Sequence, residues 1–393
     1  MTSLLEQALD FAGDLVELRR DLHRNPELSF QEHRTAATAA DAVEELGWRV
    51  RRGVGVTGVV AELGSGGPMI ALRADMDALP IQEAGDGSYR STVPGVMHAC
   101  GHDAHVSMLV GAARLITAAQ RAGRMPAGTI RLLFQPSEEA SDAENRSGAT
   151  RMVADGAMEG VSAVFGAHVG AHLESGRVFL SPGSIMAGSD VFTATVHGRS
   201  SHAARPHEGI DAVVLASHVV LACQNVVARG LAPKQEGVLT IGMIGGGVAE
   251  NILAEDVTLR GTVRYFDEEV RRVLHEGLHR SAAVADALGG STTLDLRFGY
   301  PPVINDARAT ETAARAARAT LGNDAVVSFE PMMGAEDFAI LAREAPGCFF
   351  WIGAALEPPR EHHHPAFDID ESVLPRGAAT LAACALTALT DFA

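Results

Sequence analysis

A short stretch of the sequence concentrates side chains that bind metal ions. Residues 93–109, VPGVMHACGHDAHVSML, place Cys100, His102, Asp103 and His105 within six positions. Thiolate, imidazole and carboxylate groups together suit zinc, or manganese where oxygen ligands dominate. A lone cysteine is more often a small buried side chain. The histidine two positions away and the aspartate beside it favour a metal site here.

Further acids and imidazoles follow predicted strands elsewhere in the chain. These groups are Asp77 after PMIAL, Glu138 and Glu139 after TIRLLF, His168 after SAVFGA, and His362–His364 in the segment after CFFWIG. Open α/β sheets bind ligands outside the carboxyl ends of their strands. We therefore expect the four groups to meet at one edge of a sheet, next to the loop that contains Cys100.

Glu138 and Glu139 have the most specific chemistry of these groups. Adjacent acids are usually a solvated pair, but these two follow an apolar strand and a proline. Successive side chains in extended backbone point to opposite sides. One carboxylate can therefore bind a metal ion while the other faces a water molecule, which is how a metal-dependent hydrolase divides ligand from general base.

Composition excludes several classes of protein. The 393 residues include 49 acidic and 32 basic side chains, for a net charge of −17, whereas a nucleic-acid binder needs a basic surface. Four widely spaced cysteines argue against a disulfide framework. The first residues lack the features of a signal peptide, and no uncharged run reaches the ~18 residues that span a bilayer. We expect a cytoplasmic protein without nucleic-acid or membrane partners.

The pattern of elements predicts two domains. Strands and helices alternate through most of the chain, which favours an α/β domain whose central, mostly parallel sheet is flanked by helices. The order changes to β-α-β-β-α-β between residues 188 and 298, typical of a ferredoxin-like α+β domain. We predict a discontinuous catalytic domain of residues 1–187 and 299–393 around this insertion. Near the N-terminus, Ser29 and Glu32 in SFQE predict a capping box that starts a helix.

The inserted domain contains two polar segments. His202 lies in VHGRSSHAARPHEGIDA, and a histidine in such a turn is normally just exposed to solvent. The glycine-rich segment GGGVAEN at 245–251 lacks the spacing of a phosphate-binding loop.

Motifs along nearly the whole chain resemble the M20 family of metallopeptidases and amidohydrolases. They are DLHRNPELSFQEHRTA, ALRADMDALPIQE, MHACGHDAHVSMLVGAA, LLFQPSEEA, GAHV, GRSSHAARPHEGIDA, GGGVAENILAED, GTVRYFD, GAEDFA and HHHPAFDID. RADMDALP and CGHDAH are similar to the branch that includes hippurate hydrolases, auxin-conjugate hydrolases and bacterial N-acyl-amino-acid amidohydrolases.

This resemblance implies two divalent metal ions, Zn²⁺ or Mn²⁺, with Co²⁺ as a third candidate. The implied ligands are Cys100, His102, Glu139, His168 and His363. Three consecutive histidines leave open whether His363 or His364 is the last ligand. Glu138 is implied as the general base and acid, and Asp103 and His105 as residues that support the ligands or start the following helix.

The resemblance also implies roles around the substrate. Asp77 would orient a ligand or the base. His202 would hydrogen-bond the developing oxyanion, either within its own subunit or across a dimer. Asn251 and Arg264 would bind the carboxylate of the substrate.

The implied activity is hydrolysis of the amide bond of N-acyl amino acids, such as acetyl or benzoyl derivatives, by a metal-activated water. The products are a carboxylate and a free amino acid. The inserted domain would act as a lid and as the contact surface of a homodimer, or of a tetramer. The alternatives are a dipeptidase or carboxypeptidase of the same family and an inactive metal-binding homologue. Glu138 argues against the last, because a binding protein needs no base.

Overall fold

The protein divides into two compact units in a computed structural model that describes residues 3–85 and 87–393. The larger unit comprises the chain up to Gly183, Ile304–Glu330 and Asp337–Ala393, and the smaller unit comprises Ser184–Val303 and Pro331–Glu336. Each unit has its own hydrophobic core.

These boundaries differ slightly from those predicted from the sequence. The first falls after residue 183 instead of 187 and the second after 303 instead of 298, and residues 331–336 also belong to the smaller unit. Two short strands, β7 (Gly183–Met186) and β12 (Val303–Asn305), lie at these crossings. Residues 331–336 join the smaller unit because the Ala187 N–H donates to the Gly334 carbonyl at 2.8 Å, a contact that no local pattern reveals.

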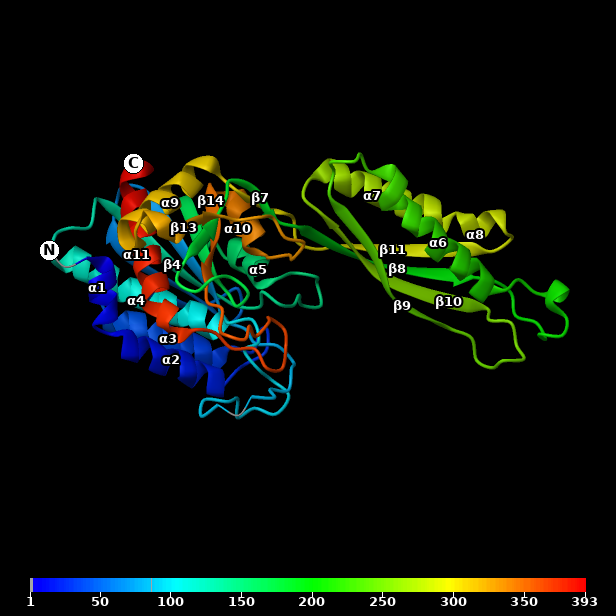
Figure 1. Cartoon of the computed structure of the whole chain (residues 1–393), viewed down its shortest axis with the longest axis horizontal. Helices are drawn as coiled ribbons and strands as arrows, with labels where there is room; N and C mark the ends of the chain where they lie inside the picture. The colour runs from blue at the N-terminus through cyan, green and yellow to red at the C-terminus, as the bar shows by residue number, and fades with distance from the viewer. Residues whose placement is uncertain (1–2, 86) are drawn as a thin grey trace. The chain divides into compact units, whose positions relative to one another are not determined.

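An eight-stranded sheet forms the centre of the larger unit (Figure 1). Its strands are β1 (Arg49–Val54), β2 (Gly58–Ser65), β3 (Met69–Asp75), β4 (Gly128–Gln135), β5 (Val161–Gly170), β6 (Val178–Leu180), β13 (Val326–Ser328) and β14 (Gly347–Gly353). They lie in the order β1-β2-β4-β3-β5-β14-β6-β13. The central strands β4, β3, β5 and β14 run parallel, so the prediction of an α/β fold with a mostly parallel sheet is confirmed.

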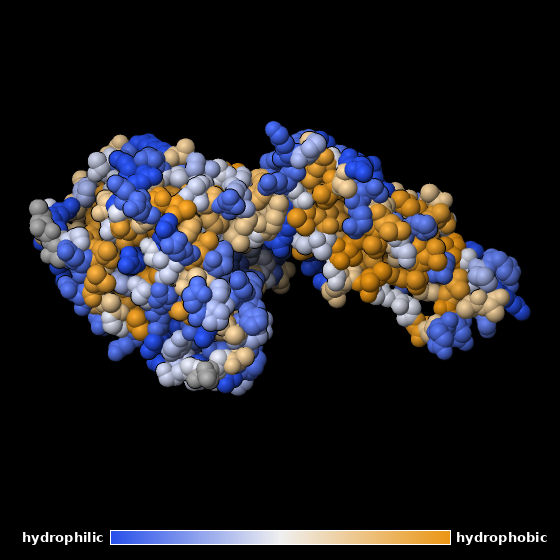
Figure 2. Space-filling model, in the orientation of Figure 1, coloured by the Kyte–Doolittle hydropathy of each residue, from blue (hydrophilic) through white to orange (hydrophobic). Residues whose placement is uncertain are grey.

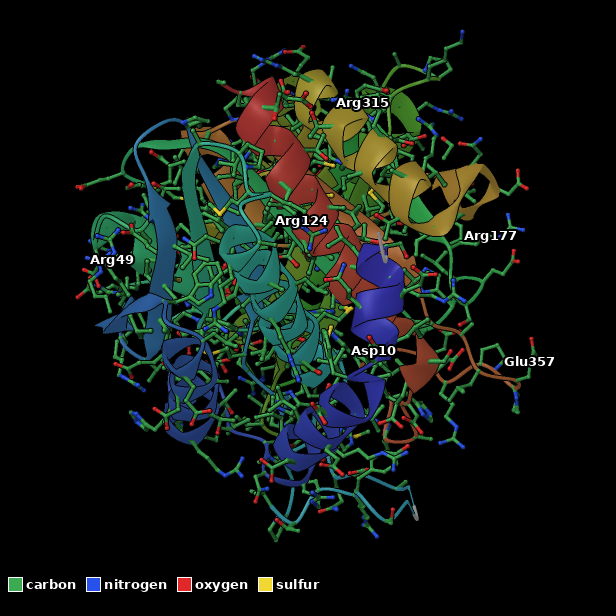
Figure 3. The ribbon with its side chains drawn as sticks, turned by 90° about the vertical axis from the view of Figure 1, so that its left-hand side faces the viewer. Asp10, Arg49, Arg124, Arg177, Arg315 and Glu357 are labelled. Carbon is green, nitrogen blue, oxygen red and sulfur yellow. The ribbon has the colours of Figure 1, made fainter. Side chains whose placement is uncertain are left out.

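Helices cover both faces of this sheet. They are α1 (Leu4–Leu9), α2 (Ala12–Arg24), α3 (His33–Glu45), α4 (His102–Arg121), α5 (Gly148–Ala154), α9 (Ala307–Leu321), α10 (Phe338–Glu344) and α11 (Leu374–Asp391). Helices α4, α11 and α9 lie side by side on one face, with charged side chains such as Arg315 at the outside (Figure 3). A Cβ on Gly377 of α11 would lie 1.9 Å from the Met108 sulfur of α4, so glycine is needed where these helices touch.

The predicted capping box before α3 is wrong. The helix begins at His33, and the preceding Glu32 makes no side-chain cap. Instead, the Ser29 hydroxyl donates to Asp77 at 2.7 Å and Glu32 accepts from the Thr57 hydroxyl at 2.5 Å. Both side chains are drawn away from the helix because buried groups beside the sheet need hydrogen-bond partners.

The smaller unit has the predicted β-α-β-β-α-β order. Its elements are β8 (Gly188–His197), α6 (Ala212–Gly230), β9 (Gly237–Gly246), β10 (Asp256–Tyr265), α7 (Glu268–Ala282), α8 (Val284–Ala287) and β11 (Ser291–Phe298). The antiparallel sheet has the order β11-β8-β10-β9, which leaves β9 at an edge. Helices α6 and α7 pack together over the sheet.

Two helical segments are long and apolar enough to cross a membrane by length and composition alone. One is Glu371–Asp391, which is 78% buried as a core helix of the larger unit. The other is Ala212–Gly230, whose outer side exposes Val213, Val214 and Leu221. Figure 2 shows apolar surface over this helix. Such segments are weak evidence for a membrane protein, since core helices pass the same test.

Candidate active site

The five predicted metal ligands meet in the larger unit. The ligand atoms of Cys100, His102 and His168 all lie within 4.8 Å of one another, and those of Cys100, Glu139 and His363 do so as well. The two groups share the Cys100 sulfur. This geometry suits two neighbouring cations that have one thiolate ligand in common.

Two of the histidines predicted as ligands present the same ring nitrogen, Nε2, to this site. His102 Nδ1 lies 2.8 Å from the Asp77 carbonyl oxygen, and His168 Nδ1 lies 2.7 Å from that of Val169. A carbonyl can only accept, so both Nδ1 atoms are donors. Nε2 is then the nitrogen left to bind a metal ion, which is the usual arrangement of a metal-ligating histidine whose other nitrogen donates a hydrogen bond. His168 Nε2 lies 3.4 Å from the Cys100 sulfur.

The surroundings of His102 Nε2 fit a cation. Within the described chain this buried atom has no hydrogen-bond partner, and the carboxylates of Asp75 and Glu139 stand 3.6 and 4.0 Å away. Burial alone would lower the pKa of His102, but Asp75 and Asp77 outweigh it and raise the pKa to about 10. A nitrogen that faces two carboxylates must hold a proton or a metal ion.

Burial shifts the pKa values of Cys100 and His168, the other predicted ligands of the first group, in opposite directions. Burial, together with the carboxylates of Glu139 and Glu138, raises the pKa of the Cys100 thiol well above its ordinary value. Burial and the nearby His105 lower the pKa of His168 well below its ordinary value. The imidazole of His168 is therefore neutral, whereas the thiol ionises only when a cation replaces its proton.

The three consecutive histidines point in three directions. His362 accepts a backbone N–H of the β5 end at 3.1 Å, and His364 accepts one from its own loop at 3.1 Å. Of the three, His363 is the one that joins a candidate ligand group, with Nε2 3.2 Å from Glu139 Oε1. Its φ of +58° lies in the left-handed region, a conformation that such residues adopt where the surrounding structure imposes it.

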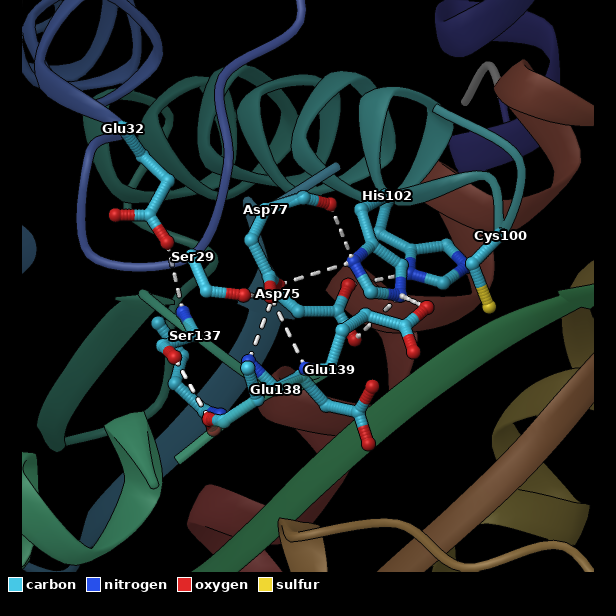
Figure 4. A network of polar contacts seen from close by, with 12 residues as sticks. Ser29, Glu32, Asp75, Asp77, Cys100, His102, Ser137, Glu138 and Glu139 are labelled. Carbon is cyan, nitrogen blue, oxygen red and sulfur yellow. Dashed lines mark hydrogen bonds and ion pairs between the residues drawn. The ribbon is translucent and has the colours of Figure 1, made fainter. Parts of the chain in front are cut away.

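Asp77 is at the centre of the hydrogen bonds that shape the site (Figure 4). One carboxylate oxygen accepts from the Glu138 N–H at 3.1 Å, and the other accepts from the Glu139 N–H at 3.0 Å and from the Ser29 hydroxyl at 2.7 Å. His102 Nδ1 lies 3.3 Å from the same carboxylate. Asp77 therefore orients both a ligand and the backbone of the glutamate pair.

Glu138 lies beside the ligands on a strained turn. Ser137 before it has a φ of +46° and donates its N–H to Glu32 at 2.8 Å. Glu138 as a residue is 7% exposed, and a carboxylate oxygen of it lies within 4.8 Å of the ligand atoms of His102 and Glu139. The nearly buried Glu138 therefore brings its carboxylate to the same site as Glu139, the predicted ligand.

A second set of buried residues was only partly expected from the sequence. His105 Nδ1 lies 2.5 Å from Asp75, whose other oxygen accepts from Arg73 at 2.7 Å. His105 Nε2 accepts the Val169 N–H at 2.9 Å, and its ring lies 4.4 Å from that of His168. These groups hold the β5 end that presents His168. Arg73 and Asp75 lie in the same RADMD motif as Asp77, at the end of a predicted strand. That position was the sequence feature that could have identified them.

In the smaller unit, the structure brings together two of the three predicted residues. His202 forms a bridge with Ile252, and the Ala203 N–H donates to the Asn251 carbonyl at 3.0 Å. His202 and Asn251 are both exposed on these neighbouring loops. Arg264 stands apart from them, eight residues beyond the start of β10, which corresponds to roughly 27 Å of strand.

Comparison with known proteins identifies a family and several relatives. The model of peptidase family M20/M25/M40 matches residues 71–387. The chain is 40% identical to N-acetyl-L-cysteine deacetylase of Bacillus subtilis (92% of this chain, 84% of that protein) and 38% identical to IAA-amino acid hydrolase ILR1-like 2 of Arabidopsis thaliana (96% and 85%). It is 37% identical to thermostable carboxypeptidase 2 of Saccharolobus solfataricus (93% and 92%).

A solved structure agrees over nearly the whole chain. The YXEP protein of Bacillus subtilis, described as a dinuclear metal binding peptidase from the M20 family, superimposes with a TM-score of 0.83 at 33% identity. The similarity covers 97% of this chain and 99% of that one.

Proposed function

The chain belongs to peptidase family M20/M25/M40, and from this premise we propose that it hydrolyses N-acyl amino acids to a carboxylate and a free amino acid. Family membership makes it a metal-dependent hydrolase of amide bonds. The proposal adds the substrate class. The relatives named N-acetyl-L-cysteine deacetylase and IAA-amino acid hydrolase support it.

The observation that supports this function best is the pair of ligand groups that share Cys100, with Glu138 beside them. Two bound ions would polarise the amide carbonyl and lower the pKa of the attacking water. Glu138 would take the proton of that water and pass it to the leaving nitrogen. Asp77 would hold the Glu138 backbone through the 3.1 Å hydrogen bond that fixes the direction of its side chain. The ions we propose are Zn²⁺, Mn²⁺ or Co²⁺.

We assign His202 to the oxyanion and Asn251 and Arg264 to the carboxylate of the substrate. His202 and Asn251 would enter the site as a pair because their loops are hydrogen-bonded to each other. Arg264 lies near the far end of β10 from Asn251. If both bind one substrate carboxylate, they come from different copies of the chain, so the active unit would be at least a homodimer.

The smaller unit has a surface suited to such a dimer. Val214 and Leu221 on α6 and Met243 and Ile244 on β9 are between 50% and 65% exposed. The neighbouring β9 edge offers unpaired backbone groups for a second strand. A second copy of the chain that covers this face would bury the apolar side chains and complete the edge. We further propose that the enzyme is cytoplasmic and binds neither membranes nor nucleic acid.

A carboxypeptidase is the second candidate, since one relative has that activity. The same ligands and base would serve peptide substrates, and only the substrate pocket would differ. An inactive metal-binding homologue is disfavoured, because Glu138 is present at the site and is not among the five ligands that we assign.

A substrate panel tests the proposed function. The metal-free enzyme is reloaded separately with Zn²⁺, Mn²⁺ or Co²⁺ and given N-acetyl, N-benzoyl and indole-acetyl amino acids alongside dipeptides. We expect kcat/KM to be highest for an acyl amino acid. Dipeptides that are cut faster than every acyl amino acid would instead support the carboxypeptidase. Glu138→Gln should retain both ions yet lose turnover by more than about 10³-fold, since it removes the base; unchanged turnover would contradict its role.

A further inference from the structure

A buried cluster of charges lies outside the two ligand groups, at the start of α4. Arg19 of α2 is fully buried and its Nε lies 2.9 Å from Asp103. The same guanidinium donates to Asp368 at 3.3 Å and to Glu371 at 3.1 Å. Its Cζ lies 5.0 Å from the centre of the Tyr89 ring. One arginine thus joins three carboxylates from two distant parts of the chain.

The two ends of this cluster are close in sequence to ligands of both groups. Asp103 directly follows His102 at the first turn of α4. Asp368 and Glu371 belong to the loop between β14 and α11, which also contains His363. This loop approaches α4 again at its other end, where the His363 N–H donates to the Ala99 carbonyl at 2.8 Å.

His363 needs this restraint more than the other ligands do. It is 53% exposed and its backbone is in the left-handed region, whereas His102 and His168 are held by buried elements. A histidine relaxes from that conformation unless its surroundings impose it. The loop after His363 therefore requires an anchor.

We propose that Arg19 is a positioning residue: by tying the loop acids Asp368 and Glu371 to Asp103, it holds His363 in place for the metal ion shared with Cys100 and Glu139. This inference rests on the proposed ligand set.

Removal of Arg19 should displace the loop more than the helix. Asp103 lies within α4 and keeps His23, whose Nδ1 lies 2.7 Å from it. Asp368 keeps the Tyr89 hydroxyl at 2.7 Å. With the guanidinium gone, Asp103 loses the buried cation that it shares with the loop acids. Asp368 and Glu371 are left with the more exposed cationic partners Arg360 and Arg20. Between β14 and α11 the loop has only turns and the short 3-10 helix Glu371–Val373, so we expect it to shift and to displace His363.

Titration of the metal-free full chain with Zn²⁺ alone tests this inference. In Arg19→Gln we expect one of the two ions to bind about 10–100-fold more weakly, as for loss of a residue that orients a ligand, and the other to bind as in the wild type. His363→Ala should weaken the same ion. The double variant should bind no more weakly than His363→Ala, because both changes act through one ligand.

Arg20→Gln is the matched control. Arg20 is the next residue of α2 and binds Glu371 at 2.6 Å, but it makes no contact with Asp103 among the interactions described. The Arg20→Gln protein should bind both ions as the wild type does. An Arg19→Gln protein that binds both ions normally, or that weakens both equally, would overturn the inference. If His363→Ala itself binds both ions normally, the ligand set proposed above fails instead.

A second variant covers the case in which Arg19→Gln does not fold. Asp368→Asn removes the loop end of the bridge at a residue that is 14% exposed, and an asparagine can still accept from Tyr89. It should weaken the same ion as His363→Ala does. Normal binding of both ions by a folded Asp368→Asn protein would overturn the inference.

Discussion

Cys100 and His102 both hold a proton at neutral pH that a metal ion would have to replace. The pKa of Cys100 is raised by burial and by Glu139, and that of His102 reaches about 10 under the influence of Asp75. Metal binding requires the deprotonated form of both. The affinity for metal ions should therefore depend on pH through these two residues.

We expect metal binding at pH 7 to release about two protons per chain, one from each of these groups. Because both pKa values lie above 7, affinity should rise as pH rises and fall as pH is lowered. Calorimetric titrations in two buffers with different ionisation enthalpies measure the released protons.

Cys100→Ser provides the control for this measurement. Serine does not ionise in this range, so the release should fall by about one proton. A wild-type protein that releases no protons would show that neither residue is a ligand.

The turn before helix α4 sets the spacing of two proposed ligands, Cys100 and His102. Gly101 has a φ of +88° and stands between Cys100 and His102. A Cβ at this position would lie 2.5 Å from Val169 Cγ2. Glycine here lets the backbone reverse and lets β5 approach, so the two ligands on either side can face the same space.

We expect Gly101→Ala to lower the free energy of unfolding by about 1–2 kcal/mol for the left-handed backbone, with a further ~1–3 kcal/mol from the clash with Val169. It should also weaken metal binding. Gly123→Ala is the control, because Gly123 has a φ of +64° just beyond α4 and open space around its Cβ position. Urea unfolding of the metal-free variants measures both losses, and equal losses would contradict the role of the clash.

Sequence patterns predicted elements and strand ends well because these depend on local periodicity. The parallel sheet brings Glu139 and His168 to the same edge as the Cys100 loop, as the strand order requires. The pairing of Arg19 with Asp368 could not be foreseen, since 349 positions separate them and each looks like an ordinary surface charge. The Ser29 capping box failed for the same reason, because a distant carboxylate competes for its hydroxyl.

At the scale of the whole molecule, the exposed face of the smaller unit leads to a prediction about assembly. We expect a particle of twice the 41.2 kDa chain mass or a larger multiple. Leu221→Arg should shift it to the monomer, because burial of an unpaired charge opposes association. Light scattering after size-exclusion chromatography measures the mass.

Leu9→Arg is the matched control, since Leu9 is 54% exposed on α1 of the larger unit. It should leave the mass unchanged. A wild-type chain that is monomeric at all concentrations, or a Leu221→Arg protein with unchanged mass, would contradict the proposed surface.

The first 70 residues lie before the stretch that the family model matches, yet they are structurally part of the site. Ser29 donates to Asp77, Glu32 accepts the Ser137 N–H, and Arg19 pairs with Asp103. Strands β1 and β2 of the central sheet also come from this region. Trimming the gene to codons 71–387 would therefore keep every proposed metal ligand but remove Ser29, Glu32 and Arg19. The functional module thus begins well upstream of the recognisable one.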